Sequence, residues 1–370
     1  MNRSHWAVSA MCCASLITSA TIVSRAGPLN PPAGPVASSY KTLVEVEPRT
    51  PISALPFTIT QTGSYYLTSS LTGQAGSNGI TVLASGVTLD LNGFGLFGVA
   101  GAGSGIAVGA VGNLEVRNGS IREWPVDGVN AIQSSNCRYQ DLRMINCGHA
   151  AIRTGISTLV QRCNINSIGF NAAPGDPNPD TWAVGIQTGF ASVVRDCVCD
   201  ATTARGYNIG DGSVMESCAS TRITASGADG YALVAGIGCV VRDSVFRGGT
   251  VAGVILGRGS HMSGCTVSFG PKGIIADTGC IISNNAIVDV DQAGVTILST
   301  ARSVTVDGNT MFGTGAIGSV GIVFSSDADI FTRNNIANFN SLFSTATPTS
   351  AGPSGSPPSF QTNPWANFSR

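Results

Sequence analysis

The sequence predicts an all-β solenoid, a parallel β-helix of about eleven rungs. The 370-residue chain contains 47 glycines and only 11% charged residues, a composition that suits many tight turns around one large buried core. A Gly followed by a large apolar residue also recurs along the chain at intervals of about 20 to 34 residues. Such an interval is too short for a domain and is typical of one turn of a solenoid.

The repeat has two registers. Its eleven unit starts are Gly79-Ile80, Gly105-Ile106, Gly128-Val129, Ala151-Ile152, Gly185-Ile186, Gly206-Tyr207, Gly230-Tyr231, Gly253-Val254, Gly273-Ile274, Gly294-Val295 and Gly321-Ile322. The second register is an apolar column at Val116, Tyr139, Val160, Val194, Met215, Val241, Met262, Ile282, Val306 and Phe331. Three positions after these residues, Cys gives way along the chain to Asn at 285, 309 and 334. No unit has a stretch long and amphipathic enough for a helix, so each unit is predicted to consist of short strands joined by turns.

The ends of the chain differ from the repeat. Residues 1–26 are predicted to be an export signal, with a basic start at Arg3, an uncharged run and the small-x-small site Ser24-Arg25-Ala26. The alternative is a retained N-terminal anchor, because the uncharged run is at the short limit for spanning a bilayer. With the signal removed, we expect no membrane span and a periplasmic, cell-surface or secreted protein.

The remaining segments complete the domain plan. Residues 27–53 are a Pro-rich lead-in, 54–340 form the solenoid, and 56–73 are expected to be a strand pair that caps its N-terminal end. Residues 341–370 are a Pro/Ser/Gly-rich tail, in which Trp365 and Phe368 are expected to fold back over an open edge.

Three phrases and the Asn column resemble a known superfamily. The phrases are PFTITQTGSYYLTSSLTG at 56–73, GVTLDLNGFGL at 86–96 and NPWANFSR at 363–370. Together they resemble the right-handed parallel β-helices of the pectin-lyase-like superfamily, and among them a group of exported bacterial proteins without an assigned activity. The resemblance implies a right-handed helix with an internal Asn ladder. The Asp-Asp and Gly-His-Gly phrases of polygalacturonases and the Trp-Ile-Asp-His phrase of pectate lyases do not occur in this sequence.

The cysteines are predicted to be core residues. Nine of them follow residue 26, and no Cys-x-x-Cys occurs. We expect mostly buried free thiols, with the alternative that stacked members of the first column form bridges. The first column is Cys163, Cys197 and Cys218, and the second is Cys137, Cys239 and Cys280. No metal site or resident cofactor is predicted.

The candidate site is the edge that precedes the unit starts. The longest unit carries the insertion GFNAAPGDPNPDTWAV at 169–184, and long loops on a rigid scaffold often carry function. Successive units place Asp127, His149, this insertion, Arg205 and Asp229 at that edge, over about four strand spacings or about 19 Å. The predicted catalytic residues are Asp180, Arg205 and His149. The predicted substrate-binding residues are Asp127, Asp176, Trp182 and Asp229.

These residue types suit a sugar chain. Trp182 can stack on a sugar ring, while the carboxylates and Arg205 can bind hydroxyls or uronates. The predicted function is therefore the binding of an extended polysaccharide or cell-surface glycan, with cleavage left open. Acids two units apart, near 10 Å, would suit inverting hydrolysis. Resemblance to the superfamily's lyases implies instead a Ca²⁺ held by carboxylates, with Arg205 as the base.

Two other interpretations remain open. Each residue of this edge also suits ordinary turn chemistry, and Asp141, Arg162 and Asp196 form an equivalent charge ladder that would simply stabilise the surface. The alternative function is a non-catalytic β-helix for adhesion or surface structure. The formal net charge of −1 favours no nucleic-acid partner.

Overall fold

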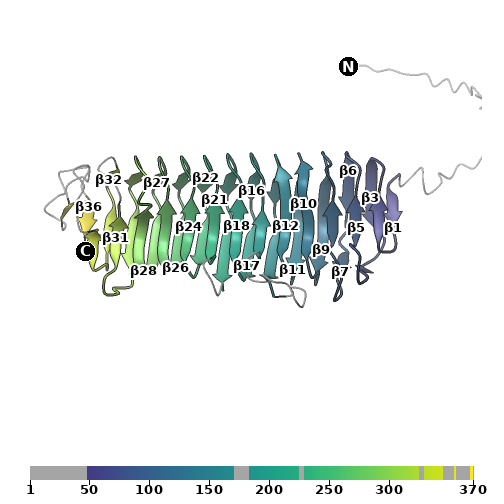
Figure 1. Ribbon diagram of the computed structural model, residues 1–370, viewed down its shortest axis with the longest axis horizontal. Helices are drawn as coiled ribbons and strands as arrows, with labels where there is room; N and C mark the ends of the chain where they lie inside the picture. The colour runs from purple at the N-terminus through teal and green to yellow at the C-terminus, as the bar shows by residue number, and fades with distance from the viewer. Residues whose placement is uncertain are drawn as a thin grey trace, which may run out of the picture. The chain divides into compact units, whose positions relative to one another are not determined.

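The computed structural model describes residues 48–170, 183–224, 229–324, 329–344, 354–355 and 367–369. The chain divides into two units, Met1–Pro48 and Arg49–Arg370, and the strands described below belong to the second. The predicted signal 1–26 and most of the lead-in lie outside the described residues. The second unit is a parallel β-solenoid of about 12 turns, whose strands stack side by side in Figure 1. The predicted fold class is confirmed.

Each turn visits three faces in the same order. Face 1 contains β2 (Phe57–Ile59), β5 (Ile80–Val82), β8 (Ile106–Val108), β10 (Asp127–Ser135), β12 (Ala150–Ile156), β15 (Val184–Gln187), β18 (Arg205–Ile209), β21 (Tyr231–Ala235), β24 (Ala252–Leu256), β31 (Val320–Val323) and β34 (Ser341–Phe343). Face 2 contains β1 (Thr50–Ile52), β3 (Gly63–Leu67), β6 (Val87–Asp90), β13 (Leu159–Gln161), β16 (Val193–Arg195), β19 (Val214–Glu216), β22 (Val240–Arg242), β25 (His261–Ser263), β27 (Ile281–Ser283), β29 (Thr305–Asp307) and β32 (Ile330–Thr332). Face 3 contains β4 (Leu71–Thr72), β7 (Gly95–Phe97), β14 (Asn164–Ile168), β17 (Val198–Thr202), β20 (Ala219–Ile223), β23 (Val245–Gly248), β30 (Thr310–Gly313), β33 (Asn335–Ala337) and β36 (Asn367–Ser369).

A few strands continue around a corner. β9 (Glu115–Arg122) and β11 (Arg138–Ile145) run from face 2 into face 3, while β26 (Thr266–Ala276) and β28 (Ala286–Ile297) run from face 3 into face 1. Every pairing between turns is parallel, and equivalent residues of neighbouring turns lie about 4.8 Å apart. The three faces enclose one core because no turn can cover its own apolar side chains.

The predicted apolar column lies in register on face 2. Val116 pairs with Tyr139, Tyr139 with Val160, and the pairing continues without a break to Val306 and Phe331. Each member of this column is completely buried. The column therefore forms one side of the core, and its prediction is confirmed.

The unit starts are in register on face 1, with one correction. Tyr207 pairs with Leu233, and Leu233 pairs with Val254, so Ala232-Leu233 fills the place predicted for Gly230-Tyr231. The slot before the apolar residue needs a small buried side chain, and Ala232 meets that need as well as Gly does.

The N-terminal segment 56–73 is not a strand pair. Its strands β2, β3 and β4 pair with β5, β6 and β7 of the next turn instead of with one another. The segment is therefore an ordinary turn of the solenoid. At the other end, β36 pairs in parallel with β33, and Phe368 lies opposite Asn335. β35 (Ser354–Gly355) adds a further strand beside β36, and Trp365 lies outside the described residues.

The corner between faces 2 and 3 contains the predicted Asn ladder. The Asn285 N–H donates to Asn309 Oδ1 at 2.9 Å, and the Asn309 N–H donates to Asn334 Oδ1 at 3.0 Å. Asn309 Nδ2 also donates to the Ile282 carbonyl at 2.9 Å. These buried amides satisfy backbone groups that the corner removes from the strand ladders.

The nine cysteines after residue 26 are buried and have no disulfide partner. Cys163, Cys197 and Cys218 precede the Asn residues in the same corner column, where the thiols of Cys197 and Cys218 lie near the carbonyls of the preceding turn. The prediction that they are core residues is confirmed.

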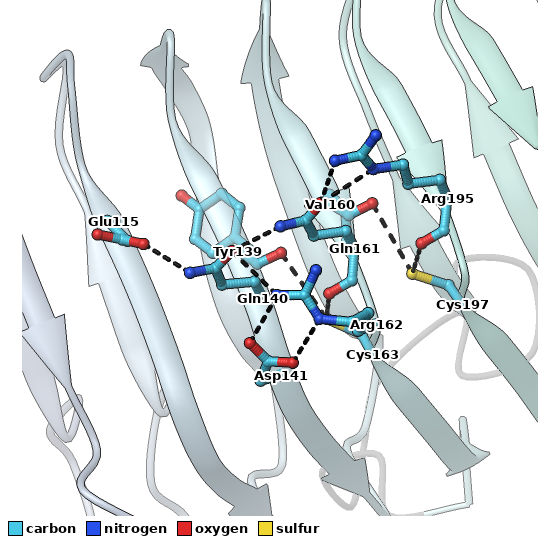
Figure 2. Close-up of polar contacts among 10 residues, drawn as sticks. All are labelled: Glu115, Tyr139, Gln140, Asp141, Val160, Gln161, Arg162, Cys163, Arg195 and Cys197. Atoms are coloured by element: carbon cyan, nitrogen blue, oxygen red, sulfur yellow. Dashed lines mark hydrogen bonds and ion pairs between the residues drawn. The ribbon is translucent and has the colours of Figure 1, made fainter.

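The outward side of face 2 carries polar ladders (Figure 2). Gln161 Nε2 donates to Gln140 Oε1 at 2.6 Å, and the Arg195 guanidinium donates to Gln161 Oε1 at 2.7 and 2.9 Å. Arg162 makes a two-point ion pair with Asp141, at 2.7 and 2.8 Å, which lowers the Asp141 pKa. Arg162 thus joins Asp141 as predicted for a stabilising ladder.

Candidate functional site

The first predicted site residue, Asp127, is enclosed by the protein. Its carboxylate is completely buried, accepts a hydrogen bond from the Ala150 N–H at 3.0 Å and lies 3.7 Å from the Arg153 guanidinium. Burial raises the Asp127 pKa, while the charges of Arg153 and His149 oppose the rise. Asp127 therefore belongs to a buried ion-pair cluster with Arg153 and has no surface to offer a polymer.

Arg205 and Asp229 lie together at the corner between faces 3 and 1. Arg205 Nη2 is 2.7 Å from Asp229 Oδ1, and both side chains are partly exposed. Arg205 is in register with Tyr231 of the next turn, and Asp229 lies two residues before Tyr231 in the chain. This pair lies three turns from Asp127, whose register partners are Ala150, Val184 and then Arg205. Asp176, Asp180 and Trp182 lie outside the described residues.

A groove lies along face 3 and its corner with face 1. We call it the corner groove. It is lined by Asp200, Thr221, Arg222, Arg247, Gly248, Phe269, Gly270, Asp289, Asp291 and Thr314. Two hollows of about 510 and 540 Å³ make up the groove, and Phe269 lines both of them. From Asp200 to Thr314 the groove crosses five turn spacings, about 24 Å.

The first hollow contains a fixed ion pair. Arg222 donates from Nε to Asp200 Oδ1 at 2.7 Å and from Nη2 to Asp200 Oδ2, and Thr221 Oγ1 donates to Asp200 Oδ1 at 2.6 Å. The hydrogen bonds from Arg222 lower the Asp200 pKa. Asp200 is therefore an ionised acceptor, held in one orientation by neighbours from the next turn.

Phe269 forms the ridge between the two hollows. Its φ is +59°, in the left-handed region that bulky residues avoid, and its side chain is 47% exposed. Arg222 and Asp289, with φ of 52° and 53°, hold the same kind of left-handed turn position on this corner. The Arg247 guanidinium covers part of the Phe269 ring at 4.3 Å from its centre. A strained, exposed aromatic residue of this kind suggests a function, because neither packing nor backbone preference favours it.

The second hollow is acidic. It contains Asp289 and Asp291, and Thr314 Oγ1 donates to Asp291 Oδ1 at 2.9 Å. Within the described residues, neither carboxylate has an ion-pair partner. Arg247 also lacks a carboxylate partner in that part of the chain. Among the described residues, the groove therefore carries an arginine without a carboxylate partner on one side of Phe269 and two carboxylates without a cationic partner on the other.

This groove was not predicted from the sequence. Its residues occupy outward-facing positions in six successive turns, and the residue types at those positions do not repeat from turn to turn. The one available signal was Phe269 in the phrase Ser-Phe-Gly-Pro, where the equivalent turn slots carry Arg222 and Asp289.

Known structures that resemble the chain are β-helix proteins. The A-module of a mannuronan C-5 epimerase from Azotobacter vinelandii is 11% identical, with a TM-score of 0.47 over 86% of this chain and 89% of that one. An alginate lyase from a Paenibacillus species is 12% identical, with a TM-score of 0.47 over 72% and 97% of the two chains. The Dettilon tailspike protein is 12% identical, with a TM-score of 0.48 over 77% of this chain and 59% of that one.

In architecture, the chain is a parallel β-helix. The strand pairings of the chain establish this β-helix directly. No family model matches the sequence, and no curated protein matches it. Across the described ranges, no group of three or more His, Cys, Asp or Glu residues is placed to hold a metal ion. In the same ranges, no helix has the length and apolar character needed to cross a membrane.

Proposed function

We propose that the protein binds an extended polysaccharide along the corner groove. The observation that carries this proposal is Phe269, an exposed aromatic side chain held at a left-handed turn between two hollows. An aromatic ring buries the apolar face of a flat partner at low entropic cost, and a sugar ring offers such a face. The polar groups on either side then supply the hydrogen bonds that sugar hydroxyls require.

The two hollows supply donors and acceptors in a fixed order. Arg222 and Arg247 offer donors on one side of Phe269, and Asp289 and Asp291 offer acceptors on the other. Charge-assisted hydrogen bonds of this kind are stronger than those between neutral groups. Because the strands beneath are paired on both sides, the groove is preorganised and little ordering entropy opposes binding.

The predicted edge adjoins this groove along the chain. Arg205 follows β17, which carries Asp200, and Asp229 follows β20, which carries Thr221 and Arg222. The Arg205–Asp229 pair therefore belongs to the same corner as the groove. Since these two charges neutralise each other and Asp127 is buried, the groove offers the better binding surface.

We propose that the protein binds the polysaccharide without cleaving it. The alternative, cleavage, rests on Asp180, Arg205 and His149 as predicted catalytic residues, and it is tested by incubating the protein with the polysaccharides. New reducing ends would indicate hydrolysis, and Ca²⁺-dependent ultraviolet absorbance would indicate elimination. Either product, if lost in Arg205→Ala, would overturn binding without turnover.

We also propose that residues 1–26 direct export, which would give the groove access to extracellular polysaccharides. Intact-mass measurement of the protein recovered from its native cells tests this. A mass lacking residues 1–26 supports export, and a retained segment contradicts it.

Affinity electrophoresis of the folded protein through gels that contain neutral or anionic polysaccharides tests the binding proposal. Retardation in at least one gel, reversed by soluble fragments of that polysaccharide, is the expected result. Uniform mobility across a broad panel would contradict it.

A further inference from the structure

A second surface of the solenoid is apolar and lies away from the corner groove. Large apolar side chains project outward at the corner between faces 1 and 2. Further apolar side chains lie beside them at the first residue of several face 2 strands. We call this surface the apolar stripe. It consists of Ile132, Ile156, Leu159, Phe190, Val193, Val214, Ile237 and Val240.

The stripe is contiguous because its members are in register. Leu159 pairs with Val193, Val193 with Val214, and Val214 with Val240, so these four side chains follow one another at the strand spacing. Ile156, Phe190 and Ile237 lie beside them at the corner, and Phe190 is 60% exposed. Isolated exposed apolar residues are common on monomers, but a continuous row of them indicates an interaction surface.

One acid interrupts the corner column, because Asp211 lies in the turn between Phe190 and Ile237, while the row from Val193 to Val240 continues past it on face 2. Asp211 Oδ1 accepts a hydrogen bond from the Ile237 N–H at 2.8 Å. The carboxylate thus accepts a hydrogen bond from a backbone group of the same corner. Beyond Ile237, the next two turns carry the Arg258–Asp277 ion pair near this corner, so the stripe ends there.

A polar rim borders the stripe on face 2. Gln161, Arg195, Glu216 and Arg242 follow one another in register, each two residues after a stripe residue on the same strand. Figure 2 shows its beginning, where Arg195 donates to Gln161. Among the described residues, Arg195 has no carboxylate partner. An apolar centre beside a polar rim is the usual composition of a protein–protein interface.

We propose that the apolar stripe binds a second copy of this chain in antiparallel orientation. A two-fold axis that lies between the two copies, parallel to the strands of face 2, and crosses the stripe between Val193 and Val214 places each of these residues opposite the other in the second copy. The same axis places Leu159 opposite Val240 and Ile156 opposite Ile237. Apolar residues therefore face apolar residues at these three pairs of positions, while Phe190 faces the turn that carries Asp211 in the second copy.

The rim favours this orientation because its charges are complementary under the same axis. Arg195 faces Glu216 of the second copy, and the contact occurs twice by symmetry. Arg195 thereby gains a carboxylate partner, which it lacks among the described residues of its own chain, while Glu216 keeps its own Arg242. A two-fold axis along the solenoid, which would give a parallel dimer, reverses the strand direction and therefore does not bring Arg195 to Glu216 of the second copy. In the antiparallel dimer, the corner grooves stay free, because they lie on face 3 and its corner with face 1.

Sedimentation velocity of the full chain at about 1 to 100 µM tests the proposal, since specific dimers of standard interface size associate in or below this range. We expect a dimer in the wild type and a monomer in Val193→Glu. Val198→Glu is the matched control, because Val198 is a 40% exposed valine on face 3, and it should stay dimeric. Circular dichroism of each variant confirms that the solenoid is folded.

Charge reversal tests the orientation. Arg195→Glu and Glu216→Arg should each weaken the dimer at least about tenfold, and the double variant should recover most of the loss because it restores opposite charges across the axis. A wild-type monomer throughout the range, or association that Val193→Glu does not change, would overturn the dimer. A double variant no better than either single variant would overturn the antiparallel orientation. None of these results depends on glycan binding.

Discussion

The Arg247 guanidinium lies 4.3 Å from the centre of the Phe269 ring, one turn away on face 3. The contact holds a cation and an aromatic face together at the centre of the corner groove. Arg247→Ala removes both a donor for the ligand and the cover of one ring face. We expect the Kd for a bound oligosaccharide to rise about tenfold, which corresponds to about 1.4 kcal/mol. Arg302→Ala, an exposed arginine outside the groove, is the control, and an equal loss in both variants would contradict a specific role.

The Asp200–Arg222 pair makes a stability prediction with a defined sign. Arg222 lowers the pKa of Asp200, so the folded state favours the ionised carboxylate more than the unfolded state does. The resulting stabilisation is present above the unfolded pKa of about 3.9 and is lost as pH falls through the folded pKa. The Tm of the wild type should therefore exceed that of Arg222→Gln at pH 7, and the gap should close in acid. A gap that is independent of pH would show that the pair does not stabilise by charge.

The Asn ladder predicts a large cost for one buried amide. Asn309→Ala removes the acceptor of the Asn285 N–H and the donor to the Ile282 carbonyl, and both groups stay buried. Unsatisfied buried groups cost about 1–3 kcal/mol each, so urea unfolding should show a loss of about 3 kcal/mol. Asn164→Ala removes an exposed amide at the start of β14, and it should cost less than about 0.5 kcal/mol. Comparable losses in the two variants would argue against the ladder.

The thiols should be unreactive until the solenoid unfolds. Burial raises the pKa of Cys147 to about 12 and that of Cys265 to about 11, so neither forms a thiolate near pH 8. A thiol reagent at pH 8 should detect none of the nine cysteines after residue 26 in the folded protein. In denaturant without reductant, it should detect nine in a chain that lacks residues 1–26 and eleven in the full chain. Fewer thiols in denaturant would reveal disulfides.

The sequence predicted the core of the solenoid because core positions are constrained in every turn. Val116 and Phe331 lie nine turns apart in one buried column, and each must be apolar to cover its neighbours. The unit start predicted at Gly230-Tyr231 was wrong for a related reason. This Gly-apolar pair lies two residues before Ala232-Leu233, which the strand pairing identifies as the unit start. A short repeat cannot distinguish such offsets when Ala and Gly both fill the small slot.

The site was harder to predict because outward positions carry no period. Phe269 and Asp200 are close in space only because loops of unequal length bring their turns into register. The sequence pattern predicted that Asp127 lies at a surface edge. In the structure, Asp127 is in register with Ala150 of the next turn, and Arg153, three residues after Ala150, forms an ion pair with Asp127 and helps to bury it. Side-chain exposure at a corner depends on such neighbours, and an alignment of the repeat units does not reveal them.

The most direct measurement is the affinity of the wild type, Phe269→Ala and Phe190→Ala for soluble fragments of the polysaccharide that retards the protein. Soluble fragments bind one groove at a time, so dimerisation does not contribute through avidity. Phe190 is an exposed phenylalanine on the opposite side of face 1 from the groove, and its loss should leave the Kd unchanged. Phe269→Ala should raise the Kd about tenfold or more. Equal Kd values for the wild type and Phe269→Ala would contradict binding in the corner groove.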